Sequence, residues 1–237
     1  MSTPANIRAR SSRNDVTSLA ERLKDALWPR TCTVHDCGRP SDRPGSYICS
    51  RCHATLPWYD EFENGAFAYL EPVSRLVNIF KFNGAEFLTA DLSDAMALSF
   101  RKKHDATQVD AVIPVPLHPR RLAMRGYNQS ALLAKAFARR IDRLCDETSL
   151  ARIRDTEYQS RLSGEERRRN LKGAFRVIDR PRIRGRVIVL VDDVMTTGST
   201  IAECTETLLE SGAHKVIPFV LAKAILDEDL DSVTATA

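Results

Sequence analysis

Long apolar segments are missing from this chain of 237 residues, and aromatic residues make up only 7% of it. One of the longest apolar runs, Val187 to Val191, falls far short of the roughly 20 residues that a membrane-spanning helix needs, so we expect no membrane span. The first 30 residues contain Arg, Asp and Ser but no apolar core of a secretory signal, and we therefore expect a cytoplasmic protein. The hydrophobic share of 43% and the charged share of 28% are ordinary for a globular protein.

Positive charge dominates the middle of the chain. Residues 118–186 hold 19 Lys and Arg against 8 Asp and Glu, a net charge of +11, whereas the whole chain has a net charge of only +4. Such a basic band favours an anionic partner, either a phosphorylated metabolite or a nucleic acid, although a solvated arginine-rich surface is the plain alternative. Its few aromatic residues, chiefly Tyr127, Phe137 and Tyr158, argue against a groove that stacks single-stranded bases.

Four of the six cysteines lie within 21 residues of one another, namely Cys32, Cys37, Cys49 and Cys52. In a reducing compartment this clustering indicates a metal site rather than disulfides. The second pair has the standard spacing of half a zinc site, and the first pair has the wide end of the usual spacing. Four thiolates would fill the coordination of Zn²⁺ and make the site structural. His35 is a rival ligand to Cys37, and Cys145 and Cys204 are interpreted as core residues.

Helical and strand patterns alternate from about residue 66 onward, which predicts an α/β fold with a parallel sheet. Helices are expected at about 88–102, 130–140 and 200–211, and strands at 111–115, 186–191 and 215–222. Loops are expected at 118–129 and over the polar, arginine-rich segment 152–175. We divide the chain into a flexible N-terminal segment (1–30), a zinc-ribbon-like knuckle (31–60), the α/β domain (61–226) and an acidic tail (227–237).

The segment from Val187 to Leu209 carries the strongest functional signal. An apolar strand ends in two acids and is followed by a small-residue turn and an amphipathic helix; the acids and the turn are Asp192, Asp193, Thr196, Thr197, Gly198, Ser199 and Thr200. Ligands of open α/β sheets bind beyond the carboxyl ends of the strands. Hydroxyl side chains and bare N–H groups at a helix N-terminus suit a phosphate. Carboxylates suit sugar hydroxyls, or Mg²⁺ held directly or through water. A capping box of Thr200 and Glu203 explains only two of these residues.

This segment resembles the diphosphoribosyl-binding signature of the type I phosphoribosyltransferase fold, in which an apolar strand, two acids and Thr-Thr-Gly-Ser-Thr follow in that order. The resemblance implies a parallel sheet flanked by helices, here with a small N-terminal zinc knuckle. It also implies that Asp192 and Asp193 contact the 2′- and 3′-hydroxyls of a ribose. Thr196 to Thr200 would then cradle its 5′-phosphate.

Two further segments resemble the ComF (competence protein F, or GntX-like) family. One is Ile113 to Leu122, continuing to Arg125-Gly126-Tyr127-Asn128-Gln129, and the other runs from Arg154-Asp155-Thr156 to Gly173-Ala174-Phe175. Lys81-Phe82-Asn83-Gly84 and Cys37-Gly38 also resemble elements of this family, and the latter favours four cysteine ligands. The first cysteine pair is wider than the family usually shows. Together with the knuckle, the resemblance covers about residues 30–224.

Each of these segments has a role in the fold that the resemblance implies. Arg120, Arg121 and Arg125 follow a strand end and can clamp the oxygens of a pyrophosphate, so by analogy they form the pyrophosphate loop. Lys81 can reach a phosphate as a point charge, or it can be an ordinary surface lysine. Segment 154–175 would be a hood that closes over the substrate, or else an arginine-rich linker. The hood residues expected to contact the ligand are Gln159, Arg167 and Asn170.

Two functions are compatible with these features. An enzyme would bind 5-phosphoribosyl diphosphate with Mg²⁺, or a nucleotide, and would transfer the phosphoribosyl group to an acceptor with release of pyrophosphate. The alternative is a non-catalytic accessory protein, because the ComF family is associated with DNA uptake and processing in natural competence. Single-stranded DNA or the competence machinery would then be the partner, and an oligomer is compatible with either function. The fold alone does not decide between them.

Overall fold

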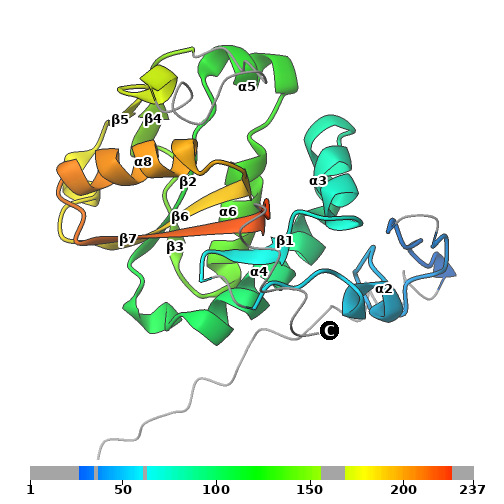
Figure 1. The fold of residues 1–237 in the computed structure, drawn as a ribbon. Helices are drawn as coiled ribbons and strands as arrows, with labels where there is room; N and C mark the ends of the chain where they lie inside the picture. The colour runs from blue at the N-terminus through cyan, green and yellow to red at the C-terminus, as the bar shows by residue number, and fades with distance from the viewer. Residues whose placement is uncertain (1–26, 35–36, 61–62, 156–168, 226–237) are drawn as a thin grey trace, which may run out of the picture.

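The computed structural model describes residues 27–34, 37–60, 63–155 and 169–225. Its centre is a sheet of five parallel strands in the order β1-β7-β6-β2-β3 (Figure 1). These strands are β1 Gly65–Ala68, β2 Ala111–Pro114, β3 Leu144–Cys145, β6 Val187–Met195 and β7 Lys215–Lys223. A separate antiparallel hairpin consists of β4 Leu150–Arg152 and β5 Phe175–Val177. The predicted α/β fold with a parallel sheet is confirmed.

Strand β6 lies inside the sheet because its sequence is apolar on both faces. It pairs with β7 from Val187 to Met195 and with β2 from Ile188 to Val191. The side chains from Ile188 to Val191 are all 0% exposed. A strand covered on both faces loses the alternation of polar and apolar residues, and this continuous apolar run is the pattern that predicted it.

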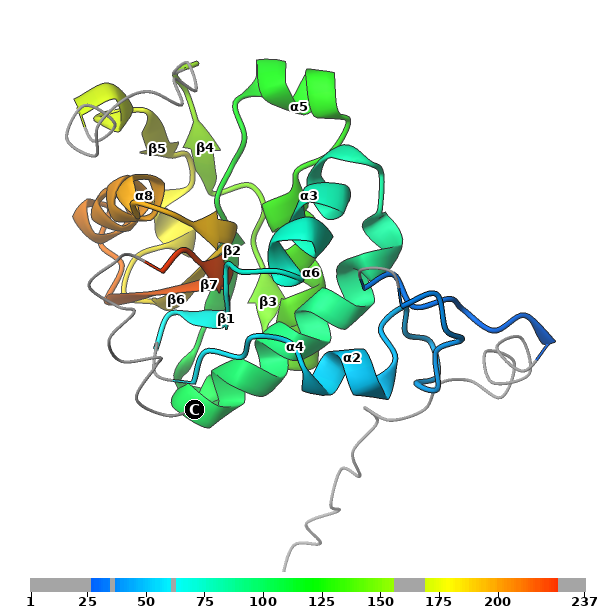
Figure 2. The ribbon, with the colours of Figure 1, turned by 45° about the vertical axis from the view of Figure 1, so that its right-hand side comes forward.

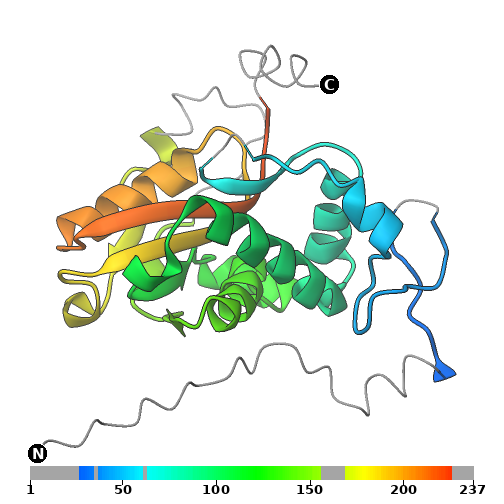
Figure 3. The same cartoon turned by 90° about the horizontal axis from the view of Figure 1, so that it is seen from below.

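Helices cover both faces of the sheet (Figure 3). One face carries α3 Val73–Phe82, α4 Thr89–Lys103 and α6 Gln129–Arg140, and the other carries α8 Ser199–Glu210 with the hairpin. Phe100 of α4 and Phe137 of α6 pack on Phe219 of β7, with ring centroids 5.1 and 5.9 Å from it. Burying each such ring contributes roughly 1.5–3 kcal/mol. In the part of the chain that the structure describes, each helix is too short or too polar to cross a membrane.

Some boundaries differ from those expected from the sequence. The expected loop at 118–129 contains a helix, α5 Pro119–Arg125, which His118 caps at its start and which ends at Gly126 with φ of +85°. A proline in the first turn and a left-handed glycine after the last turn are signals for a helix. Strand β6 continues to Met195 rather than ending at Val191, because β7 keeps pairing with it. The expected loop at 152–175 begins and ends inside the β4–β5 hairpin.

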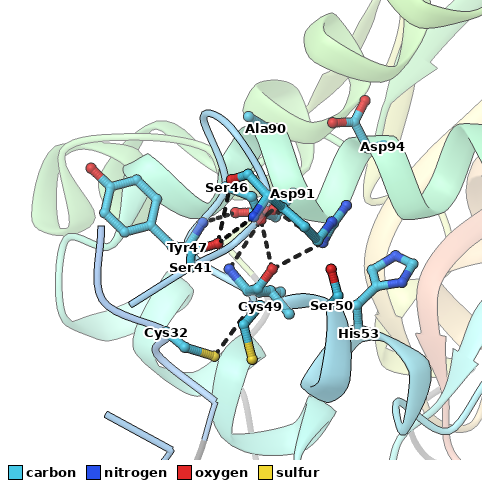
Figure 4. A network of polar contacts seen from close by, with 12 residues as sticks. Cys32, Ser41, Ser46, Tyr47, Cys49, Ser50, His53, Ala90, Asp91 and Asp94 are labelled. Atoms are coloured by element: carbon cyan, nitrogen blue, oxygen red, sulfur yellow. Dashed lines mark hydrogen bonds and ion pairs between the residues drawn. The ribbon is translucent and has the colours of Figure 1, made fainter. Parts of the chain in front are cut away.

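The N-terminal knuckle, with its short helix α2 Ser50–Ala54, packs apolar residues into the domain core and also meets α4 at one buried carboxylate (Figures 2 and 4). Asp91 of α4 is 5% exposed. It accepts hydrogen bonds from the Tyr47 N–H at 2.8 Å and from the Ser46 hydroxyl, and the Arg43 guanidinium lies 3.8 Å away. Burial raises the pKa of Asp91 above its usual range, and these three partners oppose that rise. Polar groups from the knuckle therefore converge on a single side chain of the α/β domain.

Replacing Asp91 by alanine should loosen the knuckle without unfolding the sheet. The change leaves the Tyr47 N–H without its acceptor, which should cost about 1–3 kcal/mol of folding free energy. The matched control is Asp94→Ala on the same helix, which removes a more exposed ion pair with Arg140 and should cost less than about 1 kcal/mol. Urea denaturation measures both variants, and equal losses would contradict the role of Asp91.

Candidate ligand site and metal centre

Asp192 and Asp193 lie at the end of β6, past its pairing with β2. The last pair with β2 involves Val191, whose carbonyl accepts a hydrogen bond from the Val115 N–H at 2.8 Å. On the other side β7 accompanies β6 as far as Met195. The two acids are therefore held by β7 at the carboxyl edge of the sheet, where open α/β folds bind their ligands.

The two acids have separate partners, as expected for successive side chains of a strand. Asp192 is partly buried and accepts a hydrogen bond from the Ser130 hydroxyl at 2.6 Å. Asp193 is 3% exposed, and its Oδ1 lies 3.0 Å from the Lys81 ammonium at the end of α3. Its second oxygen, Oδ2, is buried and has no hydrogen-bond partner among the described residues. This edge therefore contains a carboxylate oxygen that a ligand hydroxyl could satisfy.

Burial raises the pKa of Asp192 from 3.8 to about 7, and repulsion by Asp193 acts in the same direction. The hydrogen bond from Ser130 acts against this rise. An acid with such a pKa is about half protonated at neutral pH, so it can donate as well as accept a hydrogen bond. Adjacent acids with a perturbed pKa at the end of a strand are typical of a functional site.

Helix α8 begins at Ser199 without a side-chain cap. Its N-cap is Gly198, whose φ of +72° lies in the left-handed region that favours glycine. Among the described residues, none accepts a hydrogen bond from the N–H groups of Ser199, Thr200 or Ile201. The Thr197 and Ser199 hydroxyl oxygens lie 3.0 Å apart beside them. Uncapped N–H groups at the positive end of a helix, with hydroxyls beside them, form an anion site.

The capping-box alternative for this helix is wrong. Glu203 does not return to the start of α8, because its Oε1 accepts a hydrogen bond from the Gly173 N–H at 2.5 Å. Glu203 therefore ties α8 to the segment before β5. Of the expected hood residues, Asn170 is partly buried. Gln159 and Arg167 lie outside the described residues, and their contacts stay predictions.

The arginines expected in the pyrophosphate loop have different partners. Arg120 and Arg121 of α5 both face Asp155, with N···O distances of 3.4 and 3.9 Å. Arg125 instead donates to Gln129 Oε1 at 2.6 Å and lies 5.2 Å over the Phe82 ring. The structure thus brings Arg120 and Arg121 to one anion position, where α5 stands beside the β4–β5 hairpin (Figure 2). Lys81 joins the acids rather than the arginines.

Sequence reasoning missed three contributors to the site: Ser130, Arg152 and Asp155. Arg152 ends β4, and its guanidinium lies 5.4 Å over the Phe175 ring. Burial lowers the pKa of Arg152, Arg121 lowers it further, and Asp155 and Asp192 oppose the shift. An acid within a band of arginines was the available signal for Asp155. Ser130 and Arg152 gave no local signal, because their roles depend on distant partners.

The four clustered cysteines meet in space. The sulfur atoms of Cys32, Cys37, Cys49 and Cys52 all lie within 4.8 Å of one another. Cys37 Sγ and Cys49 Sγ are 3.8 Å apart. Sulfurs arranged as a tetrahedron about 2.3 Å from Zn²⁺ would be about 3.8 Å apart. Cys49 is the N-cap of α2, which brings Cys52 round to the same side one turn later. His35 lies outside the described residues.

Neighbouring groups shift the pKa values of two of these thiols in opposite directions. The N–H and guanidinium of Arg39 lower the pKa of Cys37 to about 6, whereas burial, followed by the neighbouring thiols, raises that of Cys52 to about 12. Four thiolates this close need a positive ion between them, so the donor set fits a structural Zn²⁺. The other cysteines have no part in the cluster: Cys204 is 0% exposed in the core, and Cys145 is partly buried on β3.

Known proteins resemble this chain over the same features. Residues 127–234 match a family described as a phosphoribosyl transferase domain. The DNA utilization protein YhgH of Escherichia coli O157:H7 is 36% identical over 214 residues, which cover 89% of this chain and 89% of that protein. Competence protein F of Haemophilus influenzae is 34% identical over 180 residues, covering 74% of this chain and 78% of that protein. Competence protein ComFC of Bacillus subtilis is 28% identical over 201 residues, covering 79% and 76%.

The matched domain includes the acid pair and the whole of the Thr196–Thr200 loop with α8. The relatives extend the likeness over most of the chain. This chain therefore belongs to the ComF family of competence protein F and the DNA utilization protein YhgH, and it carries a phosphoribosyltransferase domain of the type I fold.

Proposed function

We propose that this protein binds 5-phosphoribosyl diphosphate and transfers its phosphoribosyl group to an acceptor with release of pyrophosphate, and that a nucleotide with the same ribose 5′-phosphate binds at the same site. The observation that carries the proposal is the end of β6. There Asp193 has a buried carboxylate oxygen without a partner among the described residues, and the uncapped start of α8 at Ser199 follows within a few residues. Ribose hydroxyls fit the first feature, and the 5′-phosphate fits the second.

Each part of the site would hold a different part of the ligand. Asp192 and Asp193 accept the ribose hydroxyls, and the N–H and hydroxyl groups of the Thr196–Thr200 loop bind the phosphate. Both ends of the ribose phosphate are then held, which positions the anomeric carbon. Lys81 offsets one negative charge of the acid pair and so weakens its repulsion of an anionic ligand.

Arg120 and Arg121 would hold the pyrophosphate, whose charge grows as its bond to the anomeric carbon breaks. Mg²⁺ bound with the diphosphate would neutralise part of that charge. The oxygen-rich carboxyl edge of the sheet suits such a hard cation.

Calorimetric titration should show binding of 5-phosphoribosyl diphosphate, strengthened by Mg²⁺, and of a nucleoside monophosphate. Replacing Asp192 and Asp193 together by alanine should weaken both ligands by about tenfold or more, because each loses charged acceptors. Gly198→Val should also weaken both, since a β-branched residue is strained at φ of +72°. The Arg120→Ala, Arg121→Ala variant should weaken the diphosphate more than the monophosphate.

Arg125→Ala is the matched control for the arginine pair, because Gln129 and Phe82 hold Arg125 away from Asp155. It should change the affinity for the diphosphate less than the double variant does. An absence of heat with either ligand at millimolar concentration would contradict the proposal. If replacing Asp192 and Asp193 leaves the affinity for both ligands unchanged, the Thr196–Thr200 loop is only the start of an ordinary helix.

A role in DNA handling is the second candidate. Relatives are named DNA utilization protein and competence protein, and exposed arginines lie on β5 and in the segment between β5 and β6. They are Arg176, Arg180, Arg182 and Arg184. Salt-dependent binding of single-stranded DNA without any binding of the ribose ligands would favour this role over transfer.

The raised pKa of Asp192 should make the wild type lose stability as pH rises. The carboxyl of Asp192 releases its proton near pH 3.8 in the unfolded chain but near pH 7 in the folded protein. Between these pH values the folded state therefore progressively loses stability relative to the unfolded state. Asp192→Asn should be the more stable protein at pH 8, by an upper bound of about 4 kcal/mol at 1.36 kcal/mol per pKa unit. The partial exposure of Asp192 reduces this bound. Urea denaturation at pH 4, 6 and 8 measures the difference, and a constant difference would contradict it.

We further propose that the cysteine cluster holds about one structural Zn²⁺ per chain. Elemental analysis of protein purified without added metal should find it. Cys49→Ser should lose the metal and destabilise the knuckle while ribose-ligand binding largely remains, because the cluster and the acid pair belong to different parts of the chain. Cys145→Ser, outside the cluster, should keep the metal. Metal-free wild type with four titratable free thiols in the knuckle would refute the zinc site.

A further inference from the structure

Basic groups of residues 118–121 converge on the carboxylate of Asp155. Arg120 Nη1 lies 3.4 Å from Oδ2, and Arg121 Nε and His118 Nδ1 lie 3.9 and 3.8 Å from Oδ1. These distances exceed the roughly 2.7–2.9 Å of a strong charge-assisted hydrogen bond. Asp155 thus lies between the two arginines at distances longer than those of strong hydrogen bonds, while His118 Nδ1 accepts the Arg120 N–H as the cap of α5.

Hydrogen bonds hold the chain segments on both sides of this contact in place. On one side, His118 caps α5, which carries the two arginines. On the other side, the Ile153 N–H donates to the Ala174 carbonyl at 2.8 Å, and the Arg154 guanidinium donates to the Lys172 carbonyl at 2.6 Å. The residues just before Asp155 are therefore hydrogen-bonded to the residues just before β5, which holds Asp155 beside α5.

The positive charge around Asp155 continues below the surface. Asp155 and Asp192 both attract the Arg152 guanidinium, whereas Arg121 repels it. The side chains of Asp155 and Arg121 are 30% and 28% exposed, so an ion pair here contributes at most about 1 kcal/mol to folding. Such a small contribution to stability does not explain why a carboxylate lies at this point. Arg120, Arg121 and Arg152 together form a position that attracts an anion, and this explains the carboxylate better.

We propose that Asp155 is an internal competitor for the pyrophosphate group and so sets how tightly the protein holds it. Its carboxylate fills the anion position of Arg120 and Arg121 and must leave when a diphosphate binds there. The inference rests on the proposed function, in which these arginines hold the diphosphate. Free pyrophosphate lacks the ribose 5′-phosphate, whereas 5-phosphoribosyl diphosphate is also held through it by the acid pair and the Thr196–Thr200 loop. Asp155 therefore weakens both ligands, and 5-phosphoribosyl diphosphate keeps the additional contacts with the acid pair and the loop.

An internal competitor lowers the apparent affinity of every ligand that needs its position by the same factor. Asp155→Asn, which keeps the shape and removes the charge, should therefore tighten inorganic pyrophosphate and 5-phosphoribosyl diphosphate equally. We expect the dissociation constant of each ligand to fall about fivefold. This factor corresponds to about 1 kcal/mol, because about 1.4 kcal/mol changes a dissociation constant tenfold. A nucleoside monophosphate, which does not reach this position, should bind as it does to the wild type.

Calorimetric titration of the full chain with Mg²⁺ tests this, with circular dichroism to confirm folding. Asp155→Glu keeps the charge and should stay close to the wild type. Asp179→Asn, which removes an exposed ion pair with Arg182 at 3.1 Å, is the matched control and should change nothing. Combined with Arg120→Ala and Arg121→Ala, Asp155→Asn should lose its effect, because the competition needs the arginines.

Weaker pyrophosphate binding by Asp155→Asn would mean that Asp155 orients the arginines, and this would overturn the inference. Unchanged affinity, or tightening that survives loss of both arginines, would overturn it too. Wild type that binds neither pyrophosphate nor 5-phosphoribosyl diphosphate would instead refute the proposed function. Wild type that binds both, with Asp155→Asn indifferent, would leave the proposed function standing and remove only the competitor.

Discussion

The unequal pairing of β6 with its two neighbours is the constraint on which the rest of the structure depends. Pairing with β2 ends at Val191, while pairing with β7 continues to Met195. The strand can therefore bury its apolar first half and still carry two acids at its end without a gap in its support. The same extension sets where the chain turns at Gly198 and where α8 begins. The proposed ligand site thus depends on β6 extending beyond its pairing with β2.

Around this edge, internal ion pairs occupy the places proposed for parts of the ligand. Lys81 meets Asp193, and Asp155 meets Arg120 and Arg121. A site for an anionic ligand needs excess positive charge, and internal carboxylates limit the repulsion among these cations while no ligand is bound. The unpartnered oxygen of Asp193 and the perturbed Asp192 are unfavourable for folding. The rings around Phe219 and the buried β6 offset that cost elsewhere, as is usual for functional sites.

The knuckle solves a different physical problem. It is too small to bury a stable core of its own, and its four sulfurs within 4.8 Å of one another could hold a metal ion, a cross-link of the kind that small units use. Its attachment combines apolar packing, in which Val34 and Ile48 join the core of the α/β domain, with the carboxylate of Asp91, which accepts hydrogen bonds from Ser46 and Tyr47. Cys32 and Cys49 belong to that same core, so the cysteine cluster lies directly against the α/β domain.

The sequence by itself determined the parallel α/β fold, the strand before the acids, the Thr196–Thr200 loop and the four cysteines. Each of these is a short, contiguous pattern whose chemistry depends on its neighbours in the chain. The sequence did not predict two boundaries. The end of β6 depends on pairing with β7, and α5 lies within a basic segment that was expected to be a loop. Only the tertiary structure decided that Lys81 pairs with Asp193 and that Ser130 donates a hydrogen bond to Asp192. It also decided that Arg120 and Arg121 both lie near Asp155, whereas Arg125 binds Gln129. These contacts join segments that are distant in sequence, and their distances depend on how helices and strands pack, which no local pattern of residues records.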